Sequence, residues 1–463
     1  QTIKHLLTYK PFLIPGIGSM LLYFLFAYFL ERSDFLKLLL LYSGLFYAAW
    51  KIIQHTKFNF WIWAFIGITA RVLFLPSIPN LSQDFYRFIW DGRLLVLGIN
   101  PYMFSPEQLA NGLLNAKGLS SLEAISNAKI LIQGMGSLNA SHYSNYPPIN
   151  QLCFALAALF AKKSILGSVI VLRIIIIGAD LGILYFGKKL LERLNLPTKN
   201  IFWYFLNPFI IIELTGNLHF EGVMLFFVIW SLYMLDKKRW VFAAILIGIS
   251  VSVKLLPLLF LPLFYKYLAP EGLFKKGFWK MKTFYWVTLA TIAIAFAPFA
   301  SKTFISNFSA TIGLWFQNFE FNASVYYIIR WLGFQTVGWN IIATVGLILP
   351  MVVFICIVLL AIFRKYNTTQ KLITGMLLAV SIYFLLATTV HPWYIATPVL
   401  LSVFTKYKFP LLWSFMICFS YAAYGANGFN ENLLLVALEY SVVIGVALWE
   451  IFIKKLPKKG VII

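Results

Sequence analysis

The sequence predicts an all-α, polytopic helical membrane protein with about 12–14 transmembrane helices and interfacial helices in its outer loops. Hydrophobic residues make up 61% of the 463 residues, aromatic residues 18%, and the mean hydropathy is +0.82. Soluble domains average nearer to ~45–50% apolar residues. A membrane β-barrel would show short segments of alternating polarity, whereas the apolar runs here are long and continuous.

The candidate spans follow one another along the whole chain, and several are shorter than a full crossing of about 20 residues. Pro257 and Pro262 favour a broken half-helix over Leu256–Tyr267, since proline interrupts helical hydrogen bonding. In chain order the expected spans are Pro11–Leu30, Phe35–Ile53, Phe58–Leu75, Ile165–Gly187, Ile201–Gly216, His219–Leu235, Trp240–Val253, Leu256–Tyr267, Phe284–Phe299, Trp339–Phe363, Leu372–Thr389, Trp393–Thr405, Pro410–Tyr424 and Asn432–Ile453.

Two long connections interrupt the series of spans. Residues 76–146 are polar enough to form a large outer loop with short helices of its own. Residues 300–338 are mixed and rich in aromatic residues, which predicts a second outer loop lying along the interface. The other connections are short, so residues 1–463 are expected to form a single integral membrane domain.

Charge patterning predicts which side of the membrane each connection faces. The net charge is +22, and basic residues cluster in short connections, for example at Lys188, Lys237, Arg364 and Lys454. If the N-terminus is cytoplasmic and 148–161 is interfacial, these clusters all fall on the cytoplasmic side, as the positive-inside rule requires. The rare polar residues at span ends then all fall on the outer side: Asp84, Asp91, Asn217, His219, Glu221, Lys254 and His391.

The densest charge cluster is Ser82–Arg93, directly after an apolar span. Drawn as a helix, it places Asp84, Arg87 and Asp91 on one narrow arc. One interpretation is an ordinary surface helix in which Arg87 and Asp91 form an i,i+4 pair. The other is a catalytic carboxylate held at the membrane surface, where charged groups are costly and usually functional.

Four further polar residues near span ends allow both structural and functional interpretations. Lys254 either snorkels to the interface or binds an anion there. His391 either caps a helix or donates to a phosphate. Glu221 is favourable at a helix N-terminus by the helix dipole alone. A zinc site at His219 and Glu221 is disfavoured, because no third ligand follows at a suitable spacing.

Several motifs resemble those of bacterial polyprenol-phosphate-mannose-dependent mannosyltransferases, integral-membrane enzymes of the GT-C superfamily. The resemblance rests on DFYRFIWDGR from Asp84, GINPY from Gly98, YPP from Tyr146, GNLHFEG from Gly216, VKLLP from Val253 and HPWY from His391. It extends from about Asn80 to Tyr394. The first two motifs are fairly specific, and the later ones are informative mainly through their order.

The resemblance implies a GT-C-type fold and a transferase that moves a sugar, most simply mannose, from a polyprenyl-phosphate donor to a lipid-linked or glycan acceptor, with inversion. By position, Asp84 matches the catalytic aspartate and would act as general base. Relatives often carry a paired acidic motif where this chain has Gln83 and Asp84, so metal-independent chemistry is favoured over a divalent metal. The expected substrate-binding residues are Arg87, Asp91, Tyr146, His219, Glu221, Lys254, His391 and Tyr394.

The resemblance also implies a location and partners. The protein is expected in the cytoplasmic (inner) membrane of a bacterium as a multi-pass protein, with its active site on the extracytoplasmic, periplasmic side. Its partners would be the lipid-phosphate sugar donor, the acceptor and membrane lipids. The positive charge is explained by topology, so no nucleic acid is expected.

Two alternative functions remain open from the residues. A transporter or flippase of a lipid-linked sugar would also need charges near the membrane, but transporters commonly contain inverted repeats, and none is evident by eye. A lipid-linked glycan ligase or polymerase would use a pyrophosphate donor instead of a phosphate donor.

Overall fold

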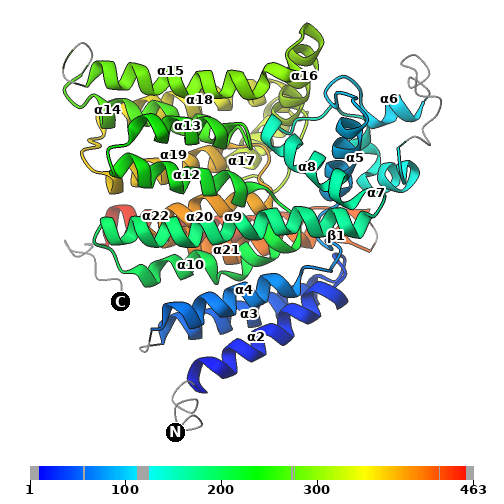
Figure 1. Ribbon diagram of the computed structural model, residues 1–463, viewed down its shortest axis with the longest axis horizontal. Helices are drawn as coiled ribbons and strands as arrows, with labels where there is room; N and C mark the ends of the chain where they lie inside the picture. Colours follow the sequence, from blue (N-terminus) through cyan, green and yellow to red (C-terminus); the bar gives the residue numbers. More distant parts are fainter. Residues whose placement is uncertain are drawn as a thin grey trace.

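The computed structural model describes residues 10–55, 58–111, 125–272, 275, 277–426 and 428–454, and their regular secondary structure is almost wholly helical (Figure 1). Within these ranges the strands are one short antiparallel pair, β1 (Tyr424–Gly425) and β2 (Gly428–Phe429). The predicted all-α class is therefore confirmed.

Among the described residues, three helices form the N-terminal part of the bundle, and four lie in or directly after the first outer loop. The N-terminal helices are α2 (Lys10–Phe29), α3 (Phe35–Gln54) and α4 (Phe60–Leu73). The loop helices are α5 (Asp84–Val96), α6 (Pro106–Ala110), α7 (Ala128–Ala140) and α8 (Pro148–Ala161). The second outer loop contains α16 (Lys302–Gln317) and α17 (Val325–Thr336).

The remaining helices form the rest of the bundle. They are α9 (Ile165–Arg193), η3 (Thr198–Ile201), α10 (Phe202–Phe205), α11 (Pro208–Ile210), the π-helix η4 (Ile211–Gly216), α12 (Glu221–Asp236), α13 (Trp240–Val251), η5 (Leu256–Leu263), α14 (Phe264–Leu268), α15 (Phe278–Phe296), η6 (Ala297–Phe299), α18 (Ile342–Phe363), α19 (Thr369–Leu386), η7 (Pro392–Ile395), α20 (Ala396–Ser402), α21 (Phe409–Met416), η8 (Ile417–Ala423), α22 (Leu433–Leu448) and the π-helix η9 (Trp449–Ile453).

Six helices among the described residues are long and apolar enough to cross a membrane, or seven if one bent pair counts as a single span. That pair is Pro208–Gly216 and Glu221–Asp236, and the chain bends by 115° between these two helices. Shorter apolar helices lie between the long ones, and the predicted half-helix at Leu256 is indeed a 3₁₀ segment followed by α14. The polytopic class is thus confirmed, and the count of 12–14 crossings stays a prediction.

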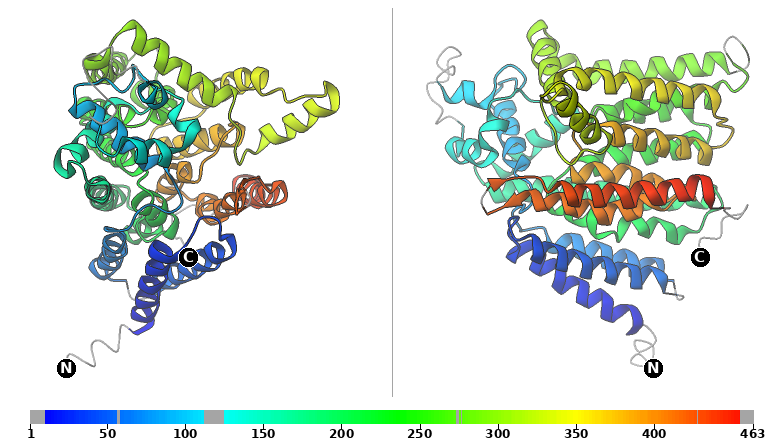
Figure 2. Two further views of the ribbon diagram at one scale, coloured as in Figure 1. Left: turned by 90° about the vertical axis from the view of Figure 1, so that its right-hand side faces the viewer. Right: turned by 180° about the vertical axis from the view of Figure 1, so that it is seen from behind.

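The long helices lie side by side, and the loop helices gather at one end of them. Figure 1 shows α9, α12, α13, α15, α18 and α22 running in similar directions, with α5 to α8 and α16 at the right. When that end faces the viewer, many bundle helices appear end-on, and the view from behind shows α2 to α4 alongside the bundle (Figure 2). We call the end that carries α5 the loop end.

The opposite end of the bundle carries basic residues. There Arg193, at the end of α9, pairs with Asp236 at the end of α12, with 2.6 Å between Nε and Oδ2. The Thr369 hydroxyl, at the start of α19, donates to the other Asp236 oxygen at 2.8 Å and contacts Tyr267 of α14. Lys188, Lys237 and Arg364 belong to the same helix ends. We call this the basic end.

The helix α8, which is expected to be interfacial, lies at the loop end of the bundle. This helix packs against α5 and against the start of α9, and Figure 1 shows it among the loop-end helices. The Ile149 amide donates to the Ser252 carbonyl at 2.9 Å, which ties the start of α8 to the end of α13. Basic and loop ends therefore separate as the charge pattern predicts.

Gly92 allows α5 and α8 to cross closely. A Cβ atom at this position would lie 2.1 Å from the Phe154 carbonyl oxygen, a backbone atom that cannot turn aside. We expect Gly92→Ala to lower the free energy of unfolding by about 1–3 kcal/mol, measured as thermal unfolding in detergent. Gly178→Ala is the control, because Gly178 in α9 has open space around it and alanine favours helix. Equal stabilities of the two variants would contradict this packing.

The second outer loop closes against the first. The Asn307 amide donates to the Tyr102 carbonyl at 3.0 Å, and the His142 ring lies 6.0 Å from the Phe319 ring. Phe321 pairs with the chain at Thr389 in an isolated parallel bridge. These contacts bring residues from both loops to the segment that contains His391.

Candidate active site

An ion pair at the loop end brings together three of the predicted site residues. Lys254 follows α13, and Glu221 is the first residue of α12. Their Nζ and Oε1 atoms lie 3.0 Å apart, and Lys254 Nζ is 5.6 Å from the centre of the Tyr146 ring. The Lys254 side chain is 22% exposed, whereas that of Glu221 is 4% exposed. The lysine is therefore the member of the pair that a ligand can reach.

Asp84 is the first residue of α5 and is partly exposed. Its carboxylate interacts electrostatically with Lys254, Glu221, Arg32 and Arg87. Burial raises the pKa of Asp84 to about 6, against the opposing effect of Lys254. At neutral pH the group is ionised yet basic enough to accept a proton, as a general base requires.

Arg87 and Asp91 form a closed, buried pair. Arg87 Nε lies 2.8 Å from Asp91 Oδ1, while Ser144 and Gln151 donate to Oδ2 at 2.5 and 3.0 Å. Arg87 also donates to the carbonyls of Asn139 and His142. Asp91 is fully buried and both its oxygens have protein partners. These contacts favour the structural i,i+4 pair, and they speak against the expectation that Asp91 binds substrate.

His219, Trp393 and His391 form a stack of three nearly parallel rings. The ring centres of His219 and Trp393 lie 3.6 Å apart, and those of Trp393 and His391 lie 4.6 Å apart. Tyr394 meets the His391 ring edge-on at 5.4 Å. His219 Nε2 and His391 Nδ1 are buried without a hydrogen-bond partner among the described residues.

His391 is not a cation at neutral pH. Burial, helped by the nearby positive charge of Lys254, lowers the pKa of His391 to about 3. A neutral imidazole can donate one hydrogen bond but adds no positive charge. Of the two roles open to His391 at a phosphate, cation or hydrogen-bond donor, the structure therefore favours the donor.

Arg32, in the turn between α2 and α3, was not predicted as a site residue. Its guanidinium carbon lies 4.0 Å from the centre of the Tyr424 ring, and Nη1 donates to the Leu81 carbonyl at 3.2 Å. A sequence signal existed: in the predicted topology Arg32 is a basic residue on the outer side, against the positive-inside rule. Trp393, which lies in the HPWY motif, is a second site residue that the sequence does not predict, and its ring stacks between those of His219 and His391.

No cluster of three or more His, Cys, Asp or Glu side chains suited to a metal ion occurs in the described ranges. Glu213, near the site in sequence, is buried and accepts a hydrogen bond from the Tyr421 hydroxyl at 2.7 Å. Asn322 is buried, and its amide donates to the Glu439 carboxylate at 3.3 Å.

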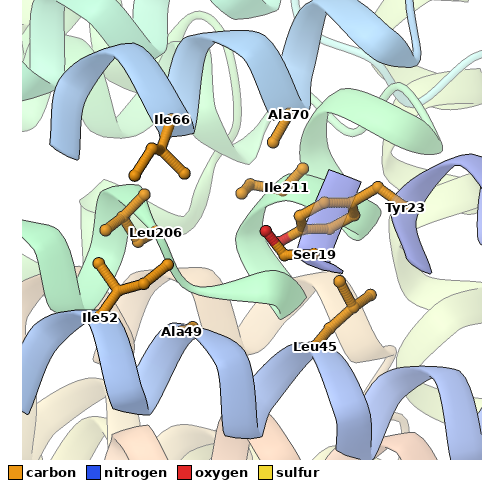
Figure 3. A pocket seen from close by; sticks show the side chains of 9 residues that line it. All are labelled: Ser19, Tyr23, Leu45, Ala49, Ile52, Ile66, Ala70, Leu206 and Ile211. Atoms are coloured by element: carbon orange, nitrogen blue, oxygen red, sulfur yellow. The ribbon is translucent and has the colours of Figure 1, made fainter. Parts of the chain in front are cut away.

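A small cavity elsewhere in the bundle is mostly apolar, and none of the predicted site residues lines it. It lies between α2, α3, α4 and the segment that carries Leu206 and Ile211, and Figure 3 shows Leu45, Ile52 and Ile66 pointing into it. Its polar groups are the hydroxyls of Tyr23 and Ser19, and the latter donates to the Gly16 carbonyl. The cavity offers no charged group to a sugar phosphate.

The chain is similar in sequence to a known protein family and to a characterised protein. The family model described as "Alpha-(1->6)-mannopyranosyltransferase, N-terminal domain" matches residues 37–270. Alpha-(1->6)-mannopyranosyltransferase A of Mycobacterium tuberculosis is 23% identical over 341 residues. This alignment covers 70% of the chain and 61% of the relative, so the chain spans about three-fifths of that relative's length. Asp84, Glu221 and Lys254 lie inside the family match, whereas Arg32 and His391 lie outside it.

Proposed function

The chain belongs to the alpha-(1->6)-mannopyranosyltransferase family, whose model matches half of it, and we propose that it is an integral-membrane mannosyltransferase. In this proposal the donor is a polyprenyl-phosphate mannose and the acceptor is a lipid-linked or free glycan. Transfer takes place with inversion at the loop end of the bundle. The observation that carries the proposal is the basic carboxylate of Asp84 beside the Lys254–Glu221 pair.

The proposed step is a single displacement. The acceptor hydroxyl oxygen attacks the anomeric carbon as its proton passes to the Asp84 carboxylate. The bond from the anomeric carbon to the phosphate oxygen breaks, and its electron pair stays on that oxygen. Because one attack occurs on one face, the configuration inverts. No step in this scheme needs a metal ion.

Lys254 and the ring stack would hold the two substrates. The Lys254 ammonium reaches the surface while Glu221 keeps it in place, so Lys254 can contact the donor phosphate. Tyr146 lies beside this ammonium, and its ring offers a face for the sugar. Trp393, His391 and Tyr394 are partly exposed and form the adjacent wall, where the neutral His391 ring can donate a hydrogen bond to the donor, while the buried His219 ring packs on Trp393.

The distribution of charge supports an extracytoplasmic site. Lys188, Lys237 and Arg364 lie at the basic end, and the positive-inside rule assigns such an end to the cytoplasm. The loop end would then face outward, into the periplasm of a bacterium whose inner membrane holds the protein. A lipid-phosphate donor suits that side, because it needs no soluble nucleotide.

The raised pKa of Asp84 predicts a pH profile. The carboxylate is the active form, so kcat/KM should fall about tenfold per unit as the pH drops below about 6. The profile is measured with wild-type enzyme from pH 4.5 to 8, with an independent check that the fold survives at the acid end. If kcat/KM does not change with pH over this range, Asp84 is not the general base.

The proposed function is tested with purified protein and polyprenyl-phosphate mannose carrying a labelled sugar. A short α-(1→6)-linked mannoside serves as acceptor. The expected product is the acceptor longer by one α-linked mannose, with release of polyprenyl phosphate. A flippase would move the donor between leaflets without forming product, and a ligase or polymerase would require a polyprenyl-pyrophosphate glycan instead. Either result would contradict the proposal.

A further inference from the structure

Arg32 is a cation held in a fixed position close to Asp84. One face of its guanidinium covers the Tyr424 ring at 4.0 Å. Its Nη1 donates to the carbonyl of Leu81, which lies three residues before Asp84, at 3.2 Å. The Leu81 amide in turn donates to Asn217 Oδ1 at 2.9 Å, so the segment that Arg32 contacts is itself anchored to the break before α12.

The other basic groups around Asp84 already have compensated charges. Lys254 pairs with Glu221 at 3.0 Å, and Arg87 pairs with Asp91 at 2.8 Å. In contrast, no carboxylate within 4 Å of Arg32 occurs among the described residues, and a protein partner is described for only one of its five N–H donors. Arg32 is partly exposed, so these donors are accessible.

An aromatic ring orients a guanidinium without neutralising it. The Tyr424 ring attracts the cation through its quadrupole and carries no net charge, so stacking leaves the charge of Arg32 uncompensated. Tyr424 belongs to the β1–β2 pair and is held by the Phe429 ring at 5.4 Å and the Phe321 ring at 6.1 Å. The guanidinium is therefore preorganised while its charge stays available to an anion.

We propose that Arg32 binds the phosphate of the lipid-linked donor and stabilises the charge that develops on it during transfer. This inference rests on the proposed function. The donor is a phosphodiester with one negative charge, and the departing polyprenyl phosphate has two, because the electron pair of the broken bond stays on its oxygen. A cation fixed beside it is thus bound more strongly in the transition state than in the ground state.

The proposal predicts that Arg32→Gln loses recognition of the phosphate selectively. The first readout is binding to the purified protein of a short-chain polyprenyl phosphate and of the matching polyprenol. Wild type should prefer the phosphate, and in Arg32→Gln this preference should shrink at least tenfold while polyprenol binding is unchanged. The second readout is transfer, for which kcat should fall about 100-fold, as when one preorganised donor to a developing oxyanion is removed.

Arg330→Gln is the matched control. Arg330 also stacks on a tyrosine, at 4.3 Å from the Tyr327 ring, and lies in the second outer loop, but its charge is paired with Glu320. We expect Arg330→Gln to keep the wild-type preference for phosphate. Arg32→Lys, which retains the charge without the stacked plane, should keep more of the preference than Arg32→Gln.

The two proposals fail in different ways. If wild type transfers mannose and Arg32→Gln does so equally fast, with an unchanged phosphate preference, the role of Arg32 is wrong and the proposed function stands. If wild type transfers no sugar, the proposed function is wrong, and the binding comparison still shows whether Arg32 recognises a lipid phosphate. An unchanged preference in both Arg32 variants overturns the inference in either case.

Discussion

Asp84→Asn is expected to reduce mannose transfer by about 100- to 10,000-fold without unfolding the protein, because a positioned general base contributes that much. The amide has nearly the shape of the carboxylate but cannot accept the proton of the acceptor hydroxyl. The fold should tolerate the change, since burial already disfavours the ionised form of Asp84 and asparagine carries no charge to desolvate. The measurement is initial-rate transfer at saturating donor, with thermal unfolding recorded on the same sample.

Asp34→Asn is the control for this variant. Asp34 also lies near the loop end, in the turn before α3, where its side chain accepts a hydrogen bond from the Lys37 amide. Asparagine caps a helix about as well as aspartate, so both stability and activity should stay at the wild-type level. Normal turnover by Asp84→Asn would remove the catalytic role from Asp84, whatever Asp34→Asn does.

Arg173→Met is expected to lower the free energy of unfolding by about 3–5 kcal/mol, a large effect for one substitution. The buried Arg173 guanidinium donates to five backbone carbonyls that belong to two separate segments. They are those of Phe74, Leu75, Ser77, Thr215 and Gly216, at 2.6 to 2.9 Å. Methionine fills much of the space but donates nothing, so buried carbonyls at the ends of α4 and η4 would lose their partners.

The control for Arg173→Met is Arg193→Met on the same helix. The Arg193 side chain is 41% exposed and pairs with Asp236 near the surface, where an ion pair contributes about 0–1 kcal/mol. Thermal unfolding in one detergent compares the two variants. If Arg173→Met unfolds at the temperature of Arg193→Met, the carbonyl cluster does not hold the loop end together.

The helical class could be predicted from the sequence because a helix that crosses the apolar core of a membrane needs about 20 consecutive apolar residues, and runs of such length are visible in the sequence. The charge pattern also predicts basic connections opposite the outer loops, and the structure places the Arg193–Asp236 and Lys254–Glu221 pairs at opposite ends of the bundle. The side of the membrane that each end faces stays a prediction. The resemblance to mannosyltransferases, read from short motifs, is confirmed by the family match over residues 37–270.

The details of the site were beyond sequence reasoning because they depend on contacts between distant segments. Periodicity placed Asp84 and Asp91 on one face of α5, but only the fold shows that the Ser144 and Gln151 side chains donate hydrogen bonds to the Asp91 carboxylate. The stack of His219 on Trp393 joins two segments far apart in the chain. The break between η4 and α12 likewise depends on tertiary packing. In place of the expected spans Ile201–Gly216 and His219–Leu235, the structure has a series of short helices and then α12, with a bend of 115° at the break.

The central claim is that a lipid-phosphate sugar reacts at the bundle end that carries Asp84, and sidedness tests it most directly. Wild-type protein is reconstituted into sealed vesicles with labelled polyprenyl-phosphate mannose, and a membrane-impermeant mannoside acceptor is added outside. Orientation is read from protease cleavage of the lysine-rich connections, which are cut only when they face outward. The account predicts product only where the loop end faces the acceptor. Product formed where the basic end faces the acceptor would contradict it.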